Sequence, residues 1–180
     1  MRIISGKYKG RLIRPPKKIN ARPTTDFAKE NLFNILETRV DFKDKEVLDL
    51  FAGTGNMSYE FASRGSQSIL AIEKDYKHFQ FIKKTTHEME MKNIIVRKIE
   101  VFKFLASCGQ QFDIIFADPP YQLKEIKKLP EIIVAKDLLK EEGFFILEHS
   151  KHNDFSHHNH FYEKRKYGSV HFSFFSKYPV

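Results

Sequence analysis

Short apolar runs alternate with amphipathic stretches through most of this chain. Five runs have the length and composition of buried strands, at residues 47–51, 68–73, 94–99, 112–117 and 144–148. The stretches between them predict helices, at residues 57–63, 76–91, 102–107 and 126–139. Short apolar strands that alternate with helices are typical of a mainly parallel sheet with helices on both faces. The pattern therefore predicts an α/β fold.

The two ends of the chain depart from this alternation. At the amino end, β-like runs at residues 2–4 and 11–13 flank a segment bounded by glycines, and we expect a small hairpin there. At the carboxyl end, runs at residues 161–167 and 170–178 are separated by Gly168. These last two runs predict an antiparallel pair at the edge of the sheet.

One further helix is predicted between the hairpin and the first strand. Thr25 or Asp26 can cap its start, and it runs to about Thr38. Its apolar flank is expected to carry Phe27, Asn31, Phe33 and Leu36.

Composition adds a charge asymmetry to this picture. The chain has 180 residues, which suits one ordinary domain, and a formal net charge of +8. Residues 1–25 contain eight basic side chains and no acidic one, whereas the other 155 residues contain 23 of each kind. The basic residues are Arg2, Lys7, Lys9, Arg11, Arg14, Lys17, Lys18 and Arg22. A basic arm (residues 1–25) on a neutral domain (residues 26–180) indicates a polyanionic partner, nucleic acid or an acidic membrane; a solvated, disordered arm is the alternative on charge alone. The predicted hairpin and the direct link of residues 22–26 into the domain favour an ordered arm that holds the substrate.

Composition also excludes several classes of protein. No apolar run approaches the roughly 20 residues of a membrane-spanning helix, and we find no secretory signal at the amino end. The single cysteine, Cys108, excludes a disulfide framework and a multi-cysteine zinc site, and we interpret it as an inert packed thiol. The spacing of His149, His152, His157, His158 and His160 favours a solvated loop, so no metal is predicted. We expect a cytoplasmic protein without a membrane partner.

The first strand runs directly into a glycine-containing turn. Gly53 and Gly55 lack a Cβ atom, so the backbone there can turn sharply and approach a ligand closely. Glu73 ends the second strand, where a carboxylate can accept both hydroxyls of a ribose. Ser58 stands where the dinucleotide fingerprint would have its third glycine. An adenosine ligand without a pyrophosphate therefore fits better than a dinucleotide.

Asp49 is a carboxylate inside the first apolar strand. A buried charge needs a partner, and S-adenosylmethionine offers an ammonium group with a positive sulfonium nearby. The alternative is that Asp49 only holds the glycine turn by accepting backbone N–H bonds.

The tetrapeptide Asp118-Pro119-Pro120-Tyr121 follows the fourth strand and faces the same edge of the sheet. The prolines remove two N–H donors, which leaves the Asp118 carboxylate and the Pro119 carbonyl as acceptors for the NH₂ group of a planar base. Such acceptors aim the nitrogen lone pair at an electrophilic methyl group, and Tyr121 can stack on the base. The alternative is an ordinary loop that begins with an Asx turn.

These motifs and their order resemble the RsmD family of S-adenosylmethionine-dependent RNA methyltransferases. The resemblance covers nearly the whole chain, and it includes segments 1–11, 22–26, 31–36, 49–55, 118–121, 147–150 and 167–168 together with Glu73. Segments 1–11 and 22–26 are the family-specific parts, whereas many amino-methyltransferases share the glycine turn and the Asp-Pro-Pro-Tyr motif. The resemblance implies a Rossmann-like class I methyltransferase with a seven-stranded, mainly parallel sheet, an antiparallel edge strand and an amino-terminal hairpin.

The resemblance also implies an activity and a set of site residues. The activity is methylation of the N2 amine of one guanine in 16S ribosomal RNA, free or in the small subunit. We expect a monomer. The implied base contacts are Asp118, Pro119 and Tyr121. The implied cofactor contacts are Asp49, Phe51, Gly53, Gly55 and Glu73, with adenine near Glu100 and Val101. The family usually has aspartate in place of Glu100 and glycine in place of Ser58.

The basic residues of the arm are predicted to contact RNA phosphates: Lys7, Lys9, Arg11, Arg14, Lys17, Lys18 and Arg22. Lys164-Arg165-Lys166 is either an extension of this RNA surface or an ordinary exposed strand. The alternatives for the activity are an amino-methyltransferase acting on DNA adenine, DNA cytosine or a protein glutamine, and a non-catalytic RNA-binding assembly factor. A nicotinamide dehydrogenase is disfavoured by the missing third glycine.

Overall fold

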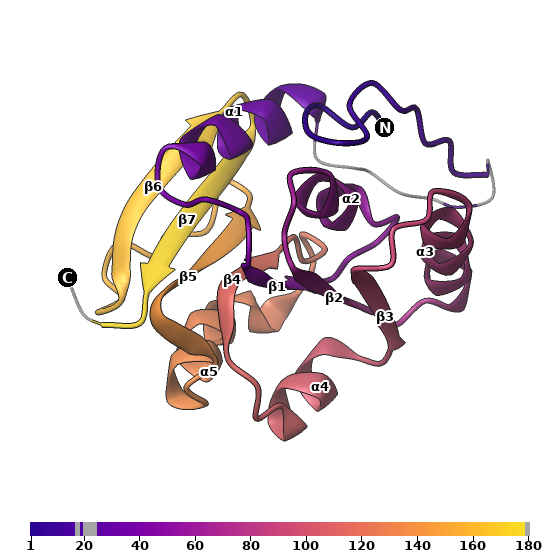
Figure 1. Ribbon diagram of the computed structural model, residues 1–180. Coiled ribbons are helices and arrows are strands. Elements are labelled where there is room, and N and C mark those ends of the chain that lie inside the picture. The colour runs from indigo at the N-terminus through magenta and orange to yellow at the C-terminus, as the bar shows by residue number, and fades with distance from the viewer. Residues whose placement is uncertain (17–18, 20–24, 179–180) are drawn as a thin grey trace.

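Seven strands form one sheet with the order β3-β2-β1-β4-β5-β7-β6 in the computed structural model, which describes residues 1–16, 19 and 25–178 (Figure 1). Neighbouring strands are parallel, except that β7 runs antiparallel to both β5 and β6. The strands are β1 (Glu46–Leu50), β2 (Ser68–Glu73), β3 (Ile94–Lys98), β4 (Phe112–Ala117), β5 (Leu139–His149), β6 (Phe161–Tyr167) and β7 (Val170–Ser176). The predicted mainly parallel sheet with an antiparallel edge is confirmed.

Helices cover both faces of the sheet (Figure 1). One face carries α1 (Asp26–Glu37), α2 (Asn56–Ser63) and α3 (Tyr76–Glu88). The other face carries α4 (Val101–Ser107), the 3₁₀ helix η1 (Lys124–Lys128) and α5 (Leu129–Ala135). Within the described residues, no helix is long and apolar enough to cross a membrane.

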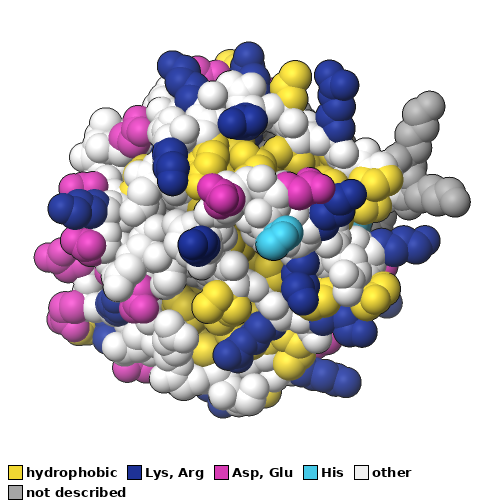
Figure 2. Space-filling view, turned by 45° about the vertical axis from the view of Figure 1, so that its right-hand side comes forward, with side chains coloured by type: hydrophobic (Ala, Val, Ile, Leu, Met, Phe, Trp, Pro, Cys, Tyr) yellow, Lys and Arg dark blue, Asp and Glu magenta, His cyan; other side chains and the backbone are white. Residues whose placement is uncertain are grey.

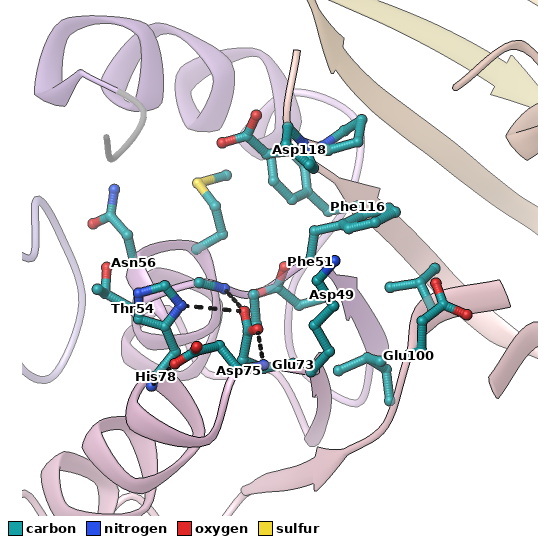
Figure 3. A pocket seen from close by; sticks show the side chains of 18 of the residues that line it. Asp49, Phe51, Thr54, Asn56, Glu73, Asp75, His78, Glu100, Phe116 and Asp118 are labelled. Carbon is teal, nitrogen blue, oxygen red and sulfur yellow. Dashed lines mark hydrogen bonds and ion pairs between the residues drawn. The ribbon is translucent and has the colours of Figure 1, made fainter. Parts of the chain in front are cut away.

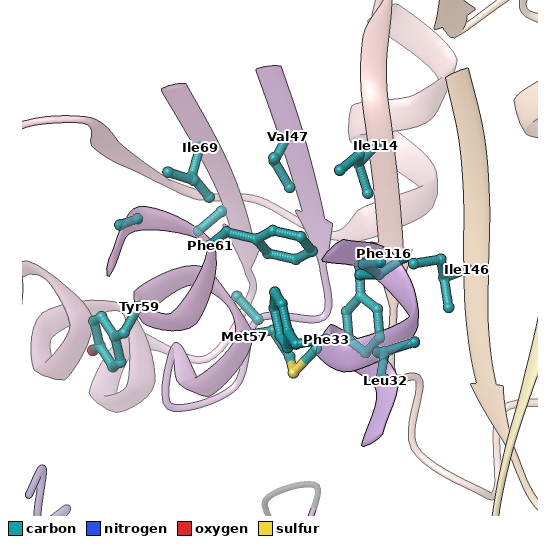
Figure 4. Close-up of a cluster of buried hydrophobic side chains, with 14 of the residues drawn as sticks. Leu32, Phe33, Val47, Met57, Tyr59, Phe61, Ile69, Ile114, Phe116 and Ile146 are labelled. Atoms are coloured by element: carbon teal, nitrogen blue, oxygen red, sulfur yellow. The ribbon is translucent and has the colours of Figure 1, made fainter. Parts of the chain in front are cut away.

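Successive residues of each strand point to opposite faces of the sheet, which divides the core into two layers. On β4, Phe116 packs toward α1 and α2, whereas Ile115 packs toward α4 and α5. Figure 4 shows the first layer, where Phe33 of α1 and Phe61 of α2 meet the strands. Their ring centroids lie 4.8 Å apart in an edge-to-face arrangement, which contributes about 0.5–1.5 kcal/mol beyond the area that the rings bury.

The predicted helical stretch over residues 126–139 is confirmed up to Ala135, but it is divided into η1 and α5 and its predicted end is wrong. Pro130 lies in the first turn of α5 and lacks an N–H donor, so a new helix begins beside it instead of continuing from η1. α5 ends at Ala135, Asp137 has a left-handed φ of 51°, and β5 already begins at Leu139. β5 is therefore longer than its apolar run at residues 144–148, and the added part includes the polar residues 140–142, which are half-buried or exposed.

The predicted helix after the arm is confirmed, but its predicted apolar flank is partly wrong. The Thr25 hydroxyl accepts a hydrogen bond from the Ala28 N–H and caps α1. The buried stripe consists of Ala28, Lys29, Leu32, Phe33 and Leu36. Phe27 lies outside that stripe and is 63% exposed.

Candidate active site

A pocket of about 490 Å³ opens at the carboxyl ends of β1, β2 and β4. This is the edge of a parallel sheet where ligands bind. Except for Gly55, every residue that the sequence predicts for the cofactor or the base lines this pocket: Asp49, Phe51, Gly53, Glu73, Glu100, Val101, Asp118, Pro119 and Tyr121. Figure 3 shows Asp118 at one end of the pocket and Glu73 and Glu100 at the other. The pocket therefore brings the predicted cofactor residues and the predicted base residues into one cavity.

The glycine turn after β1 has an unusual backbone. Phe51, Gly53 and Gly55 have φ values of 60°, 56° and 82°, all in the left-handed region. Gly53 lines the pocket, whereas Gly55 caps the start of α2 behind the pocket wall. A Cβ atom on Gly55 would lie 2.7 Å from Cζ of Tyr59, so this position also needs glycine for space. The structure thus gives Gly55 a role in the fold, and its contact with a ligand stays a prediction.

Glu73 links the glycine turn after β1 to the segment that follows β2. Its carboxylate accepts hydrogen bonds from the Gly53 N–H and the Asp75 N–H, each over 2.7 Å. Nδ1 of His78 lies 3.8 Å from the same carboxylate, and these contacts are drawn in Figure 3. Each carboxylate oxygen can accept a second hydrogen bond, so the fixed group can still receive the two hydroxyls of a ribose.

Asp49 is buried in the pocket wall, and the Ser58 hydroxyl donates to it over 2.5 Å. Burial raises the pKa of Asp49 to about 7, although hydrogen bonds from the side chain and backbone of Ser58 act in the opposite direction. A cation in the pocket would stabilise the ionised carboxylate. Ser58 was noted in the sequence only as a departure from glycine, and its role as the partner of Asp49 was missed.

Residues 118–121, which we call the acceptor loop, begin where β4 ends. Asp118 is half-buried, Pro119 is buried, and Tyr121 is 45% exposed at the pocket mouth. The Leu123 N–H donates to the Pro120 carbonyl over 2.8 Å, which closes the loop into a turn. The loop therefore presents a carboxylate and an aromatic ring from one short turn.

Glu100 and Val101 form the wall near β3. The Glu100 carboxylate accepts a hydrogen bond from the Lys103 N–H over 3.0 Å and caps α4. Val101 is buried beside it. The longer side chain at this position is therefore used to begin a helix at the pocket edge, and the apolar face of Val101 remains available to a flat ring.

The described part of the basic arm, chiefly residues 1–16, packs on the domain instead of extending into solvent. Its two β-like runs pair through one antiparallel bridge, Arg2 with Leu12, and Ile3 and Ile13 are buried. The N–H of Lys7 donates to the Ser63 carbonyl over 2.7 Å, so the arm is fixed to the end of α2.

The cationic side chains of the arm remain outside this contact. In the described part, the arm's predicted RNA contacts Lys7, Lys9, Arg11 and Arg14 are exposed. Lys17, Lys18 and Arg22 lie outside the described residues. Figure 2 shows Lys and Arg side chains across the face that includes the arm, around an apolar recess with Asp and Glu side chains. The arm thus presents positive charge from a fixed position.

A buried ion pair joins the arm to the pocket, and the sequence patterns did not reveal it. Nζ of Lys29 lies 2.6 Å from the Arg2 carbonyl, 2.8 Å from Oδ1 of Asn56 and 3.4 Å from the Glu60 carboxylate. Lys29 and Glu60 are both fully buried, and burial lowers the pKa of Lys29 while Glu60 acts against that shift. Asn56 lines the pocket. A lysine on the apolar stripe of the helix is the signal that could have indicated the pair.

The predicted solvated histidine loop is partly wrong. His149 ends β5, is buried, and its Nε2 lies 2.8 Å from the Ser173 hydroxyl. Burial lowers the pKa of His149. Among the described residues, no group of three or more His, Cys, Asp or Glu could hold a metal ion.

Cys108 is half-buried, and its sulfur lies 3.7 Å from the Gln110 carbonyl.

The strand order and the pocket at the carboxyl ends of the strands define a Rossmann-like class I methyltransferase fold. A family model described as "Conserved hypothetical protein 95" matches residues 1–176, and the chain belongs to this family, the RsmD family of methyltransferases.

Similar proteins agree with this assignment. "Putative rRNA methyltransferase YlbH" of Bacillus subtilis (strain 168) is 34% identical over 155 residues, which cover 84% of this chain and 83% of that protein. "Ribosomal RNA small subunit methyltransferase D" of Escherichia coli (strain K12) is 31% identical over 153 residues, 85% of this chain and 76% of that protein. The solved structure "Putative methyltransferase yhhF from Escherichia coli" is 27% identical with a TM-score of 0.86, and the match covers 100% of this chain and 99% of that one.

Proposed function

We propose that this protein transfers a methyl group from S-adenosylmethionine to the N2 amine of a guanine in small-subunit ribosomal RNA. One observation carries the proposal: the carboxylates that suit a cofactor, Asp49 and Glu73, line the same pocket as Asp118 and its acceptor loop. The named activity of the similar small-subunit RNA methyltransferases supports the RNA substrate. Such a substrate places the reaction in the cytoplasm, and a single chain supplies every group that we invoke, which supports a monomer.

The residues at the β1 and β2 side of the pocket fit the cofactor. Asp49 is a buried carboxylate whose pKa is raised to about 7, so a positively charged group beside it is favoured. Glu73 is held by two backbone N–H groups and faces the same pocket, where it can accept ribose hydroxyls. Val101 offers an apolar wall for the adenine. When bound, S-adenosylmethionine supplies an electrophilic methyl group on a sulfonium.

The residues of the acceptor loop fit the target base. The lone pair of a guanine N2 amine is delocalised into the ring, so the free amine is a poor nucleophile. The Asp118 carboxylate and the Pro119 carbonyl can accept its two N–H bonds and direct the lone pair toward the methyl group. As the N–C bond forms and the S–C bond breaks, positive charge develops on the nitrogen, and the Asp118 carboxylate stabilises it. The amine then releases one proton, which Asp118 or water accepts, and Tyr121 stacks on the base.

Mapping the methyl group tests this proposal. The protein is incubated with unmodified small-subunit RNA or subunits and methyl-labelled cofactor, and the labelled nucleotide is identified. We expect the label on guanine N2. Label on adenine, on cytosine or on protein would contradict the substrate assignment, and a protein that binds no cofactor would favour a non-catalytic RNA-binding factor.

A matched pair of variants tests the role of Asp118. Asp118→Asn keeps the shape of the side chain but removes its charge, and we expect turnover to fall at least about 100-fold with cofactor affinity unchanged. Glu142→Gln removes an exposed charge near the start of β5, at the opposite edge of the sheet, and should leave turnover as it is. Equal turnover in the two variants would refute the assigned role.

A further inference from the structure

A second surface beside the pocket combines exposed aromatic and basic side chains. We propose that this surface, formed by Phe27, Tyr167, Lys164, Arg165 and Lys166, binds the single-stranded RNA that flanks the target nucleotide. The inference rests on the proposed function, because it assumes an RNA substrate. It adds residues outside the basic arm to the predicted RNA contacts.

The strand register places this surface at the pocket edge of the sheet. Ala117, which precedes the acceptor loop, pairs with Leu147 of β5, and Leu147 pairs with Ser173 of β7. Since β7 is antiparallel to β5, the turn between Tyr167 and Val170 extends beyond the carboxyl ends of the parallel strands. Figure 1 shows α1 lying beside this end of β6 and β7. The turn and the acceptor loop thus both lie beyond the carboxyl ends of the parallel strands.

Two aromatic rings meet on this surface. The Phe27 and Tyr167 ring centroids are 6.4 Å apart with an interplanar angle of 83°. Tyr167 is half-buried and its ring lies 6.2 Å from that of Phe172, which anchors it to the core. Phe27 is 63% exposed although it lies in the first turn of α1, whose residues Ala28, Leu32, Phe33 and Leu36 are buried. A large apolar ring exposed to water is suited to stacking on a nucleobase, because every base has a flat aromatic face.

The neighbouring edge strand supplies positive charge. Residues 163–166 of β6 contain three basic side chains and one acidic one. Arg165 pairs with Glu163, which also pairs with Arg39. Lys164 and Lys166 are exposed, and neither takes part in an ion pair in the described part of the chain. Arg165 lies on the same face of β6 as Tyr167, whereas Lys164 and Lys166 pair with Ser173 and His171 on the other face. Because β6 is the last strand of the sheet, these two lysines lie at its rim, where they are complementary to the phosphates of RNA that continues from Phe27 around this strand.

The first turn of α1 connects the surface to the basic arm. Asp26 pairs with Arg2 of the arm over 3.9 Å, and the next residue, Phe27, contacts Tyr167. The arm itself reaches the pocket wall, where the Met1 sulfur lies 3.8 Å from the Thr54 hydroxyl. RNA that enters across the arm and leaves across β6 would therefore pass the pocket mouth, where Tyr121 is exposed.

Phe27→Leu is the first test, because it keeps an apolar side chain but removes the ring. With unmodified small-subunit RNA, we expect KM for RNA to rise at least about fivefold, with kcat and the Kd of S-adenosylmethionine unchanged. Tyr178→Ala is the matched control: Tyr178 is 53% exposed and lies beyond Ser176, which pairs with Phe144 at the opposite edge. It should leave KM unchanged. A Phe27→Leu variant with the KM of the unaltered protein would overturn the stacking role.

The charges are tested by salt dependence. Lys164→Gln with Lys166→Gln should reduce the slope of log Kd for RNA against log salt by up to about 1.4. Lys43→Gln with Lys136→Gln removes two exposed lysines elsewhere on the surface and should not change the slope. Equal slopes in the two double variants would overturn the phosphate role.

RNA binding, measured by fluorescence anisotropy without cofactor, separates the two proposals. If RNA binds through these residues but no methyl group reaches guanine N2, the proposed function is wrong and the RNA-binding role of the surface is supported. If guanine N2 is methylated and all these variants behave as the unaltered protein does, the surface alone fails.

Discussion

The Ser58 hydroxyl donates a hydrogen bond to the Asp49 carboxylate over 2.5 Å, and both side chains are buried at the wall of the pocket. This pair connects the first turn of α2 to the strand that precedes the glycine turn. Burial raises the pKa of Asp49 to about 7, so this carboxyl group changes its charge near neutral pH. The protonation state of Asp49 should therefore control how well a cationic cofactor binds.

Cofactor affinity is the first consequence. The ionised form of Asp49 attracts the ammonium and sulfonium of S-adenosylmethionine, and this form disappears as the pH falls through about 7. We expect the Kd of the cofactor to rise by up to about tenfold for each pH unit below 7 and to level off above about pH 8. Calorimetric titration across this range measures it. Asp49→Asn should remove the dependence, and a dependence that survives in Asp49→Asn would contradict the assignment.

The same pKa shift predicts how the ligand-free protein responds to pH. The folded state holds the Asp49 proton more tightly than the unfolded chain does, so this group's contribution to stability is present at low pH. It is lost as the pH rises from about 4 to about 7. Asp49→Asn should reduce this loss, which urea unfolding at several pH values would reveal. An unchanged pH profile in Asp49→Asn would show that other groups dominate.

Gly55 and Gly10 allow space and backbone strain to be separated. Both have a φ of 82°, but a Cβ on Gly55 would meet the Tyr59 ring at 2.7 Å, whereas nothing lies within 4 Å of one on Gly10. Gly10→Ala should lower the free energy of unfolding by about 1–2 kcal/mol from the left-handed backbone alone. Gly55→Ala should cost about 1–3 kcal/mol more because of overpacking. Equal losses in chemical denaturation would exclude the contact with Tyr59 as the reason for glycine.

Local patterns in the sequence predicted the sheet and the pocket because both depend on local features. Each central strand is a short apolar run, and Glu73 and Asp118 lie directly at strand ends, where a parallel sheet brings them to one edge. The start of β5 was missed because Lys140, Glu141 and Glu142 are polar and resemble the end of a helix. Sequence periodicity cannot show a strand whose side chains remain partly exposed.

Local sequence patterns did not predict the contacts between segments that are distant in the chain. Lys29 and Glu60 lie on different helices, and nothing in either local sequence specifies the other as its partner. The contacts that hold the arm were missed for the same reason, because the groups that bind it belong to α2. The carboxylate of Glu60 accepts hydrogen bonds from the N–H groups of Ile4 and Ser5 over 2.9 and 3.1 Å. These pairings follow from packing alone.

Lys29 should be important for stability and for the attachment of the arm. Lys29→Met retains most of the side-chain volume but leaves the Arg2 carbonyl and Oδ1 of Asn56 without this donor. We expect a loss of about 3–5 kcal/mol in urea unfolding and faster proteolysis within the arm. Lys84→Met is the control, because the exposed Lys84–Glu88 pair, with atoms 3.7 Å apart, should contribute at most about 0.5 kcal/mol. Similar losses in the two variants would contradict the role of the buried pair.

The arm is best tested by its charges rather than by its removal. Deleting it would remove Ile3 and Ile13 from the core and take two donors from Glu60, so weaker RNA binding could reflect damage to the domain. Replacing the four exposed cations Lys7, Lys9, Arg11 and Arg14 by glutamine leaves the packing of the arm in place. The slope of log Kd for RNA against log salt should then fall by about 0.7–0.9 for each phosphate that the arm no longer binds, while cofactor affinity stays constant. RNA binding is measured by anisotropy at several salt concentrations, with Lys43→Gln and Lys136→Gln as charge controls. An unchanged slope in the fourfold variant would show that the arm binds no phosphates.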